Sequence, residues 1–283
     1  MNIVVCIKQV PDTSDVRIDP TTNNLVREGI PCIMNPCDRN AIEEALKIKD
    51  RMKCKVITIS MGPPQAINVL QESLDMGADR AILLSDRTLA GSDTLATGYV
   101  ISELIKTLDS SLVICGAEAI DGSTGQVGPS LAENLGWPHI TYVNEIIQFS
   151  KTEISISREV KEVYEHFKCS LPVLICVIKG INDPRACKES EKRPELFDLK
   201  SLGLDINRIG INGSPTRVDN IVVSNRRSMS FVVVDSSLSA DERIELIVNG
   251  GMKPKKVNLL RGRPADLAKL ILNDETFARY LNN

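Results

Sequence analysis

The sequence predicts an α/β protein built on a doubly wound, mostly parallel sheet. Short apolar runs rich in β-branched residues alternate with longer segments of helical periodicity over residues 1–140. Continuous apolar runs of this kind are typical of strands that are buried on both faces. Their alternation with helices favours right-handed crossover connections, which place helices on both faces of a parallel sheet.

Four buried strands and four helices are expected in this region. The strands are expected at Val4 to Ile7, Val56 to Ile59, Ala81 to Leu84 and Leu112 to Cys115. In each helix the apolar residues recur every three or four positions and therefore share one face. These faces comprise Ala41, Ala45, Ile48 and Met52; Ile67, Leu70 and Leu74; Thr97, Ile101, Leu104 and Leu108; and Val127, Leu131 and Leu135.

The helix ends carry recognisable signals. The expected starts are Asn35 as a capping side chain with Pro36 at the first helical position, Asp93 as the cap of the third helix, and Ser123 or Thr124 opening the fourth. Gly77 and Gly136 stand where helices commonly end in a left-handed residue. Each of the four helices therefore has at least one marked end.

The pattern changes after Pro138. Residues 153–158 alternate strictly between polar and apolar, which predicts an antiparallel strand with one solvated face, and residues 171–178 return to the core. Residues 182–225 hold three prolines with several glycines and charges, and regular structure is hard to find there. Because so long a structureless segment is unusual inside a compact domain, we expect an arm that leaves the domain and packs on a partner.

The last sixty residues recover order. The elements expected there are a strand at Phe231 to Val234, a helix from Ala240 to Val248, a strand near Val257 to Leu260 and a helix from Pro264 to about Tyr280. The chain is therefore divided into an α/β domain (1–182), an extended C-terminal arm (183–225) and a small α/β appendage (226–283).

Composition excludes several classes of function. The net charge of −3 gives no electrostatic footprint for nucleic acid. No apolar run approaches the ~18 residues of a membrane span, and the first residues lack the basic lead-in of a signal peptide, so we expect a cytoplasmic protein. The eight cysteines include no C-x-x-C pair, and no metal site is expected. Cys6, Cys115 and Cys176 lie in apolar runs and are interpreted as small buried thiols.

The most informative stretch is the glycine-rich turn from Gly116 to Pro129, which follows a strand and runs into a helix. Small residues let the backbone approach a ligand closely, and a helix start offers free N–H groups to an anion. The turn therefore resembles a phosphate cradle, although it matches neither the G-x-G-x-x-G nor the Walker pattern. A plain strand–helix turn explains the same residues about equally well.

A second helix start contributes to the same hypothesis. The run Ala90-Gly91-Ser92-Asp93-Thr94-Leu95-Ala96-Thr97 offers hydroxyl groups at the beginning of the third helix. Hydroxyls and free N–H groups there suit a second phosphate or a ribityl chain. Taken alone, Asp93 and Thr97 are equally well explained by helix capping and solvation.

Several motifs together resemble the electron-transfer flavoprotein β subunits. The signature is Asp121-Gly122-Ser123-Thr124-Gly125-Gln126-Val127-Gly128-Pro129. The other matching segments are, in order, Val5 to Asp12, Met34 to Asp38 followed by Ala41 to Ala45, Met61 to Pro64, Met76 to Ala81, Leu171-Pro172, Lys179 to Arg185 and Gly213 to Val218. The resemblance covers about residues 1–220, and motifs in the right order are far more specific than any one of them. Residues 226–283 are not part of it.

The resemblance implies a modified nucleotide-binding fold, similar to that of adenine-nucleotide hydrolases, in residues 1–182. Many β subunits hold only AMP, and their signature carries an acidic residue where Gly122 stands and a threonine where Val127 stands. The glycine-rich form found here resembles the electron-bifurcating subgroup, whose β subunit holds FAD. A Ser/Ala-Asp-Thr-x-Ala-Thr run like residues 92–97 lies beside the FAD in that subgroup. The implied cofactor is therefore FAD, with AMP as the alternative.

The resemblance also implies which residues contact the cofactor. Those expected around adenosine are Cys6, Asn35, Pro36, Cys37, Asp38 and Met61. Those expected at the phosphates are Gly116, Ala117, Glu118, Asp121, Gly122, Ser123, Thr124, Gly125, Gln126 and Val127. Those expected at the flavin are Asp93, Thr94 and Thr97. Simpler roles remain open for some of them: Met61 as core filler, Cys6 in strand packing and Asn35 as a helix cap.

The implied function is the β subunit of an NADH-dependent, flavin-based electron-bifurcating complex of anaerobic metabolism, inactive alone. Its FAD would accept hydride from NADH and pass one electron to ferredoxin. The other electron would go through a second FAD in the α subunit of the heterodimer to a flavin dehydrogenase of acyl-CoA or lactate type. No catalytic acid–base residue is expected, because the flavin carries the redox chemistry.

Two alternatives and one docking site complete these expectations. A conventional β subunit with structural AMP is the first alternative. A nucleotide-binding or nucleotide-hydrolysing module of the same fold is the second, although the S-G-G-x-D-S loop of ATP pyrophosphatases is absent from the first strand–helix turn. Residues 189–204, with Leu196, Phe197 and Leu199, could dock the dehydrogenase or pack on the α subunit. The sequence leaves open the terminal dehydrogenase, the role of residues 226–283 and the stoichiometry.

Overall fold

The computed structural model describes residues 1–12, 31–161 and 163–216, with the isolated residues 238–241, 243–244, 262–263 and 269. The chain divides into two compact units, Met1–Val223 and Ser224–Asn283. Within the second unit, residues 240–241 and 243–244 are helical, in agreement with the helix expected there. Residue 269 is also helical and falls within the helix expected from Pro264 to about Tyr280, whereas the two strands expected in the appendage and residues 217–225 of the expected arm lie outside the described residues.

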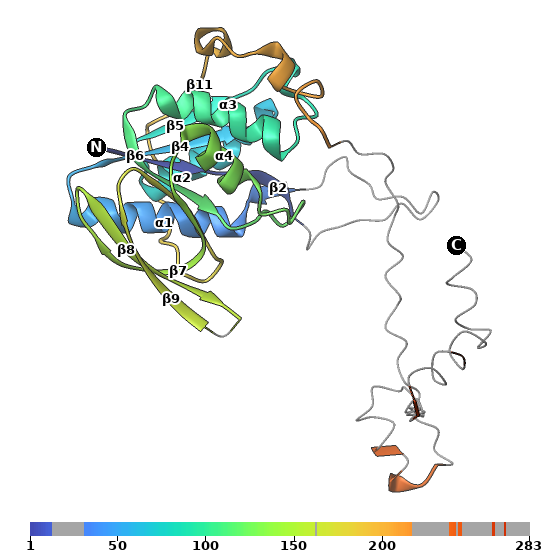
Figure 1. The fold of residues 1–283 in the computed structure, drawn as a ribbon. Coiled ribbons are helices and arrows are strands. Elements are labelled where there is room, and N and C mark those ends of the chain that lie inside the picture. Colours follow the sequence, from blue (N-terminus) through green and yellow to red (C-terminus); the bar gives the residue numbers. More distant parts are fainter. Residues whose placement is uncertain are drawn as a thin grey trace. The chain divides into compact units, whose positions relative to one another are not determined.

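A nine-stranded sheet forms the centre of the first unit (Figure 1). Its order is β11 (Glu195–Leu196), β5 (Arg80–Leu84), β4 (Lys55–Met61), β1 (Asn2–Cys6), β6 (Ser110–Gly116), β10 (Val173–Val177), β7 (His139–Phe149), β8 (Glu153–Val160) and β9 (Val163–Ser170). The strands from β11 to β7 pair in parallel, and β7, β8 and β9 pair antiparallel. The predicted doubly wound, mostly parallel fold is confirmed.

Helices cover both faces of the parallel part. They are α1 (Pro36–Arg51), α2 (Ile67–Met76), α3 (Thr94–Lys106) and α4 (Val127–Leu135). Two successive residues of β1 show how the layers form. Val5 packs in the apolar cluster that includes residues of α1 and α2, and Val4 packs in the cluster that includes residues of α3 and α4. Side chains alternate along a strand, so one buried strand supplies both cores. All four predicted strands and helices are present.

Several elements were not predicted. A small antiparallel sheet of β2 (Gln9–Pro11) and β3 (Cys32–Met34) stands apart from the main sheet. Strands β7, β9 and β11 extend the main sheet at its two ends. The short 3-10 helices η2 (Pro64–Ala66), η3 (Arg87–Leu89), η4 (Leu199–Leu202) and η5 (Ile206–Arg208) shape the connections.

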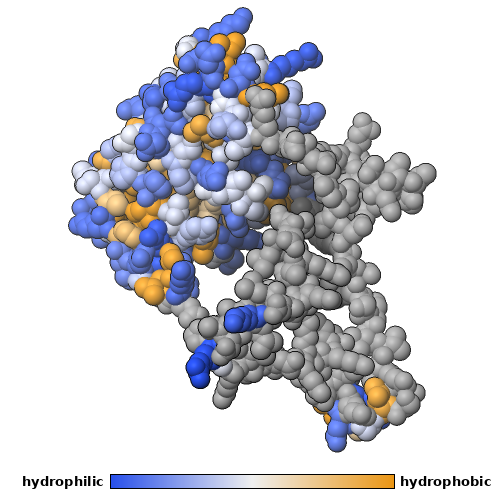
Figure 2. Space-filling model, turned by 45° about the vertical axis from the view of Figure 1, so that its right-hand side comes forward, coloured by the Kyte–Doolittle hydropathy of each residue, from blue (hydrophilic) through white to orange (hydrophobic). Residues whose placement is uncertain are grey.

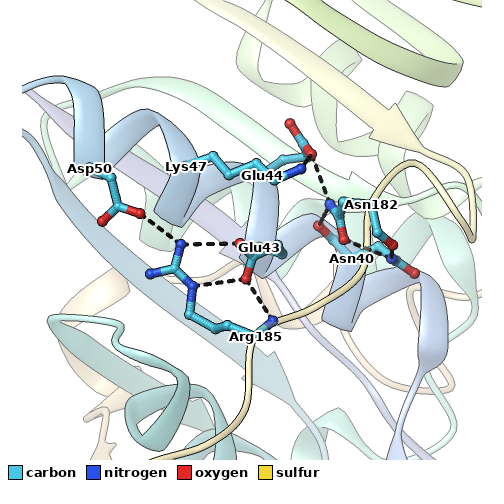
Figure 3. Close-up of polar contacts among 7 residues, drawn as sticks. All are labelled: Asn40, Glu43, Glu44, Lys47, Asp50, Asn182 and Arg185. Atoms are coloured by element: carbon cyan, nitrogen blue, oxygen red, sulfur yellow. Dashed lines mark hydrogen bonds and ion pairs between the residues drawn. The ribbon is translucent and has the colours of Figure 1, made fainter.

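The expected arm begins with a clamp on α1, shown in Figure 3. The Arg185 guanidinium donates to Glu43 at 2.9 Å through Nε and to Asp50 at 2.8 Å through Nη2. Beside it, the amide of Asn182 donates to Glu44 at 2.8 Å and accepts from the amide of Asn40 at 2.8 Å. The turn after β10 is thereby held along the helix.

Residues 183–216 then run along the domain instead of leaving it, which differs from the expectation. Backbone pairing adds Glu195 and Leu196 to the sheet beside β5. Phe197 and Leu202 pack against the α3–α4 cluster, whereas the Leu196 side chain is 69% exposed. The segment holds only short regular elements, β11, η4 and η5, and is attached both by backbone hydrogen bonds and by individual side chains. Whether it also contacts a partner stays a prediction.

The described surface is ordinary for a folded protein. On the face drawn in Figure 2, apolar side chains lie in small groups among hydrophilic ones. Among the described residues, no helix combines the length and the apolar character needed to cross a bilayer. The expected cytoplasmic location stays a prediction.

Candidate functional site

A large open cleft lies at the carboxyl ends of β1, β4, β5 and β6, where the loops lead to the helices. Its volume is about 1440 Å³. Small-molecule pockets usually measure roughly 300–1,000 Å³, so the cleft is large enough for a dinucleotide. The carboxyl edge of an open parallel sheet is also where such folds bind ligands.

Most of the predicted site residues line this cleft. They are Cys6, Asn35, Asp38, Met61, Asp93, Thr94, Thr97, Gly116, Ala117, Glu118, Gly122, Ser123, Thr124, Gly125, Gln126 and Val127. Three do not: Pro36 and Cys37 belong to the first turn of α1, and Asp121 lies in the signature loop without facing the cleft. The fold thus brings the three predicted groups to one place, and their contacts with a cofactor stay a prediction.

Some lining residues were missed. Ser85, Asp86 and Arg87 follow β5 directly, and the rule that ligands bind at carboxyl ends of strands could have found them. Lys8, which follows β1, could have been found in the same way. Thr216 lies 123 positions after Asp93, the residue to which its side chain donates a hydrogen bond, and no local sequence signal predicts that contact.

Asn35 has a different role from the one expected. It precedes α1, but its side chain makes no capping hydrogen bond. Instead its amide donates to the carbonyl of Glu118 at 2.9 Å and accepts from the N–H of Ile120 at 3.2 Å. The capping prediction is therefore wrong: Asn35 ties the start of α1 to the loop that leaves β6.

Asp38 is buried beneath this loop, with 5% of its surface exposed. Its carboxylate accepts the backbone N–H of Lys8 at 2.8 Å. Burial raises the pKa of Asp38 to about 7, against the opposing effects of hydrogen bonds from Asn35, Lys8 and Gly116 and of the Lys8 charge. A Cβ on Gly116 would lie 2.2 Å from an Asp38 oxygen, so only glycine fits there. Asp38 thereby fixes the ends of β1 and β6 against α1.

Asp93 caps α3 as predicted. Its carboxylate accepts the N–H groups of Leu95 at 3.0 Å and Ala96 at 3.1 Å. Its other oxygen accepts from the Thr216 hydroxyl at 2.8 Å. Burial acts to raise the pKa of Asp93, but these hydrogen bonds outweigh it and hold the pKa below its ordinary value. Both oxygens are thus engaged by the protein, and Asp93 joins α3 to the end of the 183–216 segment.

The fourth helix begins later than expected. It starts at Val127 after Gln126, with no side-chain cap, so neither Ser123 nor Thr124 opens it. Ser123 and Gly125 have φ angles of 48° and 62°, and left-handed residues cannot belong to a right-handed helix. The Thr94 hydroxyl donates to the Gln126 side chain at 3.0 Å. This bond brings the beginnings of α3 and α4 together at one wall of the cleft.

A row of thiols crosses the sheet below the cleft, and two of them, Cys6 and Cys115, line it. Cys6, Cys115 and Cys176 are register neighbours on β1, β6 and β10, and all three are buried. The hydrogen bond with Cys176 acts to lower the pKa of Cys115, but its bond with Cys6 and burial outweigh this and hold the pKa well above the ordinary value. The hydrogen bond with Cys115 and burial likewise raise the pKa of Cys176 well above the ordinary value, so Cys115 and Cys176 are neutral. In the described part of the chain, no cluster of His, Cys, Asp and Glu is placed to hold a metal ion.

Comparison with known proteins decides the family. A family model described as "Electron transfer flavoprotein domain" matches residues 22–199, more than half of the chain. The chain belongs to the electron transfer flavoprotein family. It is 47% identical over 224 residues to the electron transfer flavoprotein subunit beta of Clostridium acetobutylicum, covering 77% of this chain and 86% of that one. The subunit beta from Megasphaera elsdenii is 43% identical over 247 residues, covering 82% and 91%.

A third relative is subunit CarD of a caffeyl-CoA reductase-Etf complex from Acetobacterium woodii. It is 44% identical over 226 residues, covering 77% of this chain and 86% of its own. The resemblance inferred from the motifs is thus confirmed at the level of the β subunits of electron transfer flavoproteins. Such subunits bind flavin or AMP and pair with an α subunit.

One further observation concerns the room that the cleft offers to a flavin dinucleotide. Gly122 lines the cleft, and a Cβ built on it would meet no other atom within 4 Å. A side chain at this position would therefore project into free space at the cleft and reduce the room for a ligand. The glycine keeps that space open beside the start of α4, where unpaired N–H groups favour an anion.

Proposed function

We propose that this chain is the β subunit of an electron-bifurcating electron transfer flavoprotein and holds FAD in the cleft. One observation carries the proposal: the glycine-lined loop 122–127 and the beginnings of α3 and α4 converge on a single cleft of about 1440 Å³. AMP would need only part of that space. The remainder, along Asp93, Thr94 and Thr97, suits the ribityl chain and ring of a flavin.

Each group of residues has a distinct part in binding. The N–H groups at the start of α4, together with the loop 122–126, would bind the diphosphate. Asn35 and Asp38 do not need to touch the cofactor, because they fix the loop after β6 and the end of β1 from below. The buried side chains of Cys6 and Cys115 supply the floor. Thr94 and Thr97 offer hydroxyls from the beginning of α3, beside this loop.

Bound FAD would supply hydride acceptance from NADH and release of single electrons. The protein contributes position and electrostatics, and no acid–base residue is required of it. Ferredoxin would take one electron, and the FAD of the α subunit the other. The α subunit would pass its electron to a flavin dehydrogenase.

The name of the CarD relative supports an acyl-CoA type of dehydrogenase as the last partner, because that protein belongs to a complex with a caffeyl-CoA reductase. A lactate-type dehydrogenase is the competing possibility. The exposed Leu196 at the sheet edge and the packed Phe197 beside it make residues 189–204 a candidate docking segment.

Cofactor analysis tests the proposal. The heterodimer is purified with its α subunit, denatured, and its released FAD and AMP are quantified by chromatography. Two FAD per heterodimer and bleaching of the flavin absorbance by NADH are expected. One FAD with one AMP would instead identify a conventional β subunit. Hydrolysis of ATP by the isolated chain would point to the third possibility, a nucleotide-hydrolysing module.

A further inference from the structure

Lys8 stands at the mouth of the cleft, directly after β1. Its backbone is fixed on both sides. The N–H of Lys8 donates to the Asp38 carboxylate at 2.8 Å, and its carbonyl accepts the N–H of Asn35 at 2.9 Å. The root of the side chain is therefore held in place, while 50% of the side chain is exposed.

The ammonium group of Lys8 reaches across to the signature loop. Its Nζ lies 2.8 Å and 2.6 Å from the two carboxylate oxygens of Asp121, a residue 113 positions away. The Asp121 side chain is 30% exposed, so water surrounds the pair. Exposed ion pairs of this kind contribute little net stability, and either partner can exchange for another group of the same charge.

Few cations are available to a ligand in this cleft. Among the described lining residues, the cationic side chains are those of Lys8 and Arg87. Lys8 follows β1, whose neighbour β6 leads into the signature loop, whereas Arg87 follows β5, two strands away on the other side of β1. The anionic groups of Asp38 and Glu118 also line the cleft on the side of Lys8 and the loop. A diphosphate at the loop therefore has Lys8 as its neighbouring positive charge.

We propose that Lys8 is a phosphate-binding residue for which Asp121 and the ligand compete. This inference rests on the proposed function. The diphosphate of a dinucleotide takes the place of the Asp121 carboxylate on Nζ, and a lysine ammonium is well suited to this as a point charge with three rotatable donors. Asp121 is then a regulator of affinity that keeps nucleotide binding weaker than the cradle alone would allow.

The proposal predicts opposite effects for two substitutions. The full chain, freed of co-purifying nucleotide, is titrated calorimetrically with ADP and with adenosine, which has no phosphate. Lys8→Gln weakens ADP binding about tenfold and leaves adenosine binding unchanged, as expected for loss of one charged hydrogen bond. Asp121→Asn strengthens ADP binding by roughly threefold or more, because the competitor is removed. In the Lys8→Gln/Asp121→Asn double variant this gain disappears.

A matched ion pair serves as control. Lys106 and Glu103 on α3 are 2.8 Å apart and 47% and 26% exposed, close to the values for Lys8 and Asp121, but they do not line the cleft. Lys106→Gln and Glu103→Gln are expected to leave ADP binding unchanged. Thermal unfolding followed by circular dichroism verifies that each variant is folded.

The possible outcomes separate this inference from the proposed function. If the unaltered chain binds neither ADP nor FAD, the proposed function fails and the inference with it. If ADP binds equally well to the unaltered chain and to Lys8→Gln, Lys8 makes no phosphate contact and only the inference is overturned. If Asp121→Asn weakens ADP binding, Asp121 supports the ligand instead of competing with it, and the inference is again overturned.

Discussion

The floor and the rim of the cleft differ in how closely the protein surrounds each residue. The floor comprises Asp38, Cys115, Gly116 and Gly128, with Cys176 packed beneath it, and the rim comprises Lys8 and Gly122, with Asp121 paired to Lys8. A Cβ added to the floor glycines Gly116 or Gly128 would lie 2.2 Å or 2.3 Å from a neighbouring side-chain atom. One added to the rim glycine Gly122 meets nothing within 4 Å. The floor should therefore control the stability of the fold, and the rim the choice and affinity of the ligand.

A large effect on stability is expected at Gly128, where α4 packs on β10. In Gly128→Ala the new methyl group would lie 2.3 Å from the Cys176 sulfur. Overpacking of this kind costs about 1–3 kcal/mol, although alanine is the better helix former by ~0.5–1 kcal/mol. We expect the free energy of unfolding in urea to fall by about 2 kcal/mol.

The double variant Gly128→Ala/Cys176→Ala provides the control for that prediction. Removing the sulfur opens the space that the methyl group needs, so much of the lost stability should return. A gain in stability from Gly128→Ala alone, as helix propensity would give, would show that the floor is not tightly packed.

An effect at least as large is a pH dependence that originates at Asp38. Because burial raises its pKa to about 7, the folded protein binds a proton that the unfolded chain, with an ordinary pKa, releases at lower pH. The stabilisation is complete below the unfolded pKa and is lost as pH rises through about 7. Between pH 5 and pH 8 the free energy of unfolding should fall by roughly 2–3 kcal/mol from this group.

Urea unfolding at several pH values tests this expectation. Asp38→Asn should remove most of that fall. Asp86→Asn is the matched control, because the hydrogen bonds from Thr88 lower the pKa of Asp86 and place its titration below this range. If the free energy of unfolding of Asp38→Asn falls between pH 5 and pH 8 as much as that of the unaltered protein, Asp38 does not titrate in this range.

The sequence predicts the floor better than the rim. The thiols and the small residues follow strands that are continuous apolar runs, and their register places them together. The partners of the rim are set by the fold: Lys8 meets Asp121 over 113 positions, and Asp93 meets Thr216 over 123. No local pattern carries such pairings.

The elements that were missed are likewise those that lack a local sequence pattern. The pairing of β7 with β8 shifts register twice, and these irregularities interrupt the alternation that would have revealed β7. Residues 183–216 attach through single side chains such as Arg185 and through the short strand β11, and elements this short leave no helical or strand periodicity in the sequence. The late start of α4 follows from the left-handed Gly125, which the residue type permits but does not require.

The smallest effect on stability, but a clear effect on binding, is expected at Gly122. Its φ is not in the left-handed region and its surroundings are open, so Gly122→Asp should change the free energy of unfolding by less than about 0.5 kcal/mol. The carboxylate would stand in the cleft beside the phosphate loop, where bulk and negative charge both oppose a diphosphate. FAD affinity should fall about tenfold or more, and AMP, with one phosphate and no flavin, should lose less.

Two further variants separate bulk from charge at Gly122. Gly122→Asn has nearly the same shape without the charge, and Gly122→Ala adds only a methyl group to open space. Fluorescence titration should show the highest affinity for FAD with glycine at position 122, a lower one with alanine, a lower one again with asparagine and the lowest with aspartate. Equal FAD affinity in all four proteins would show that the rim at Gly122 faces no part of the ligand, because a negative charge in contact with a diphosphate must weaken its binding.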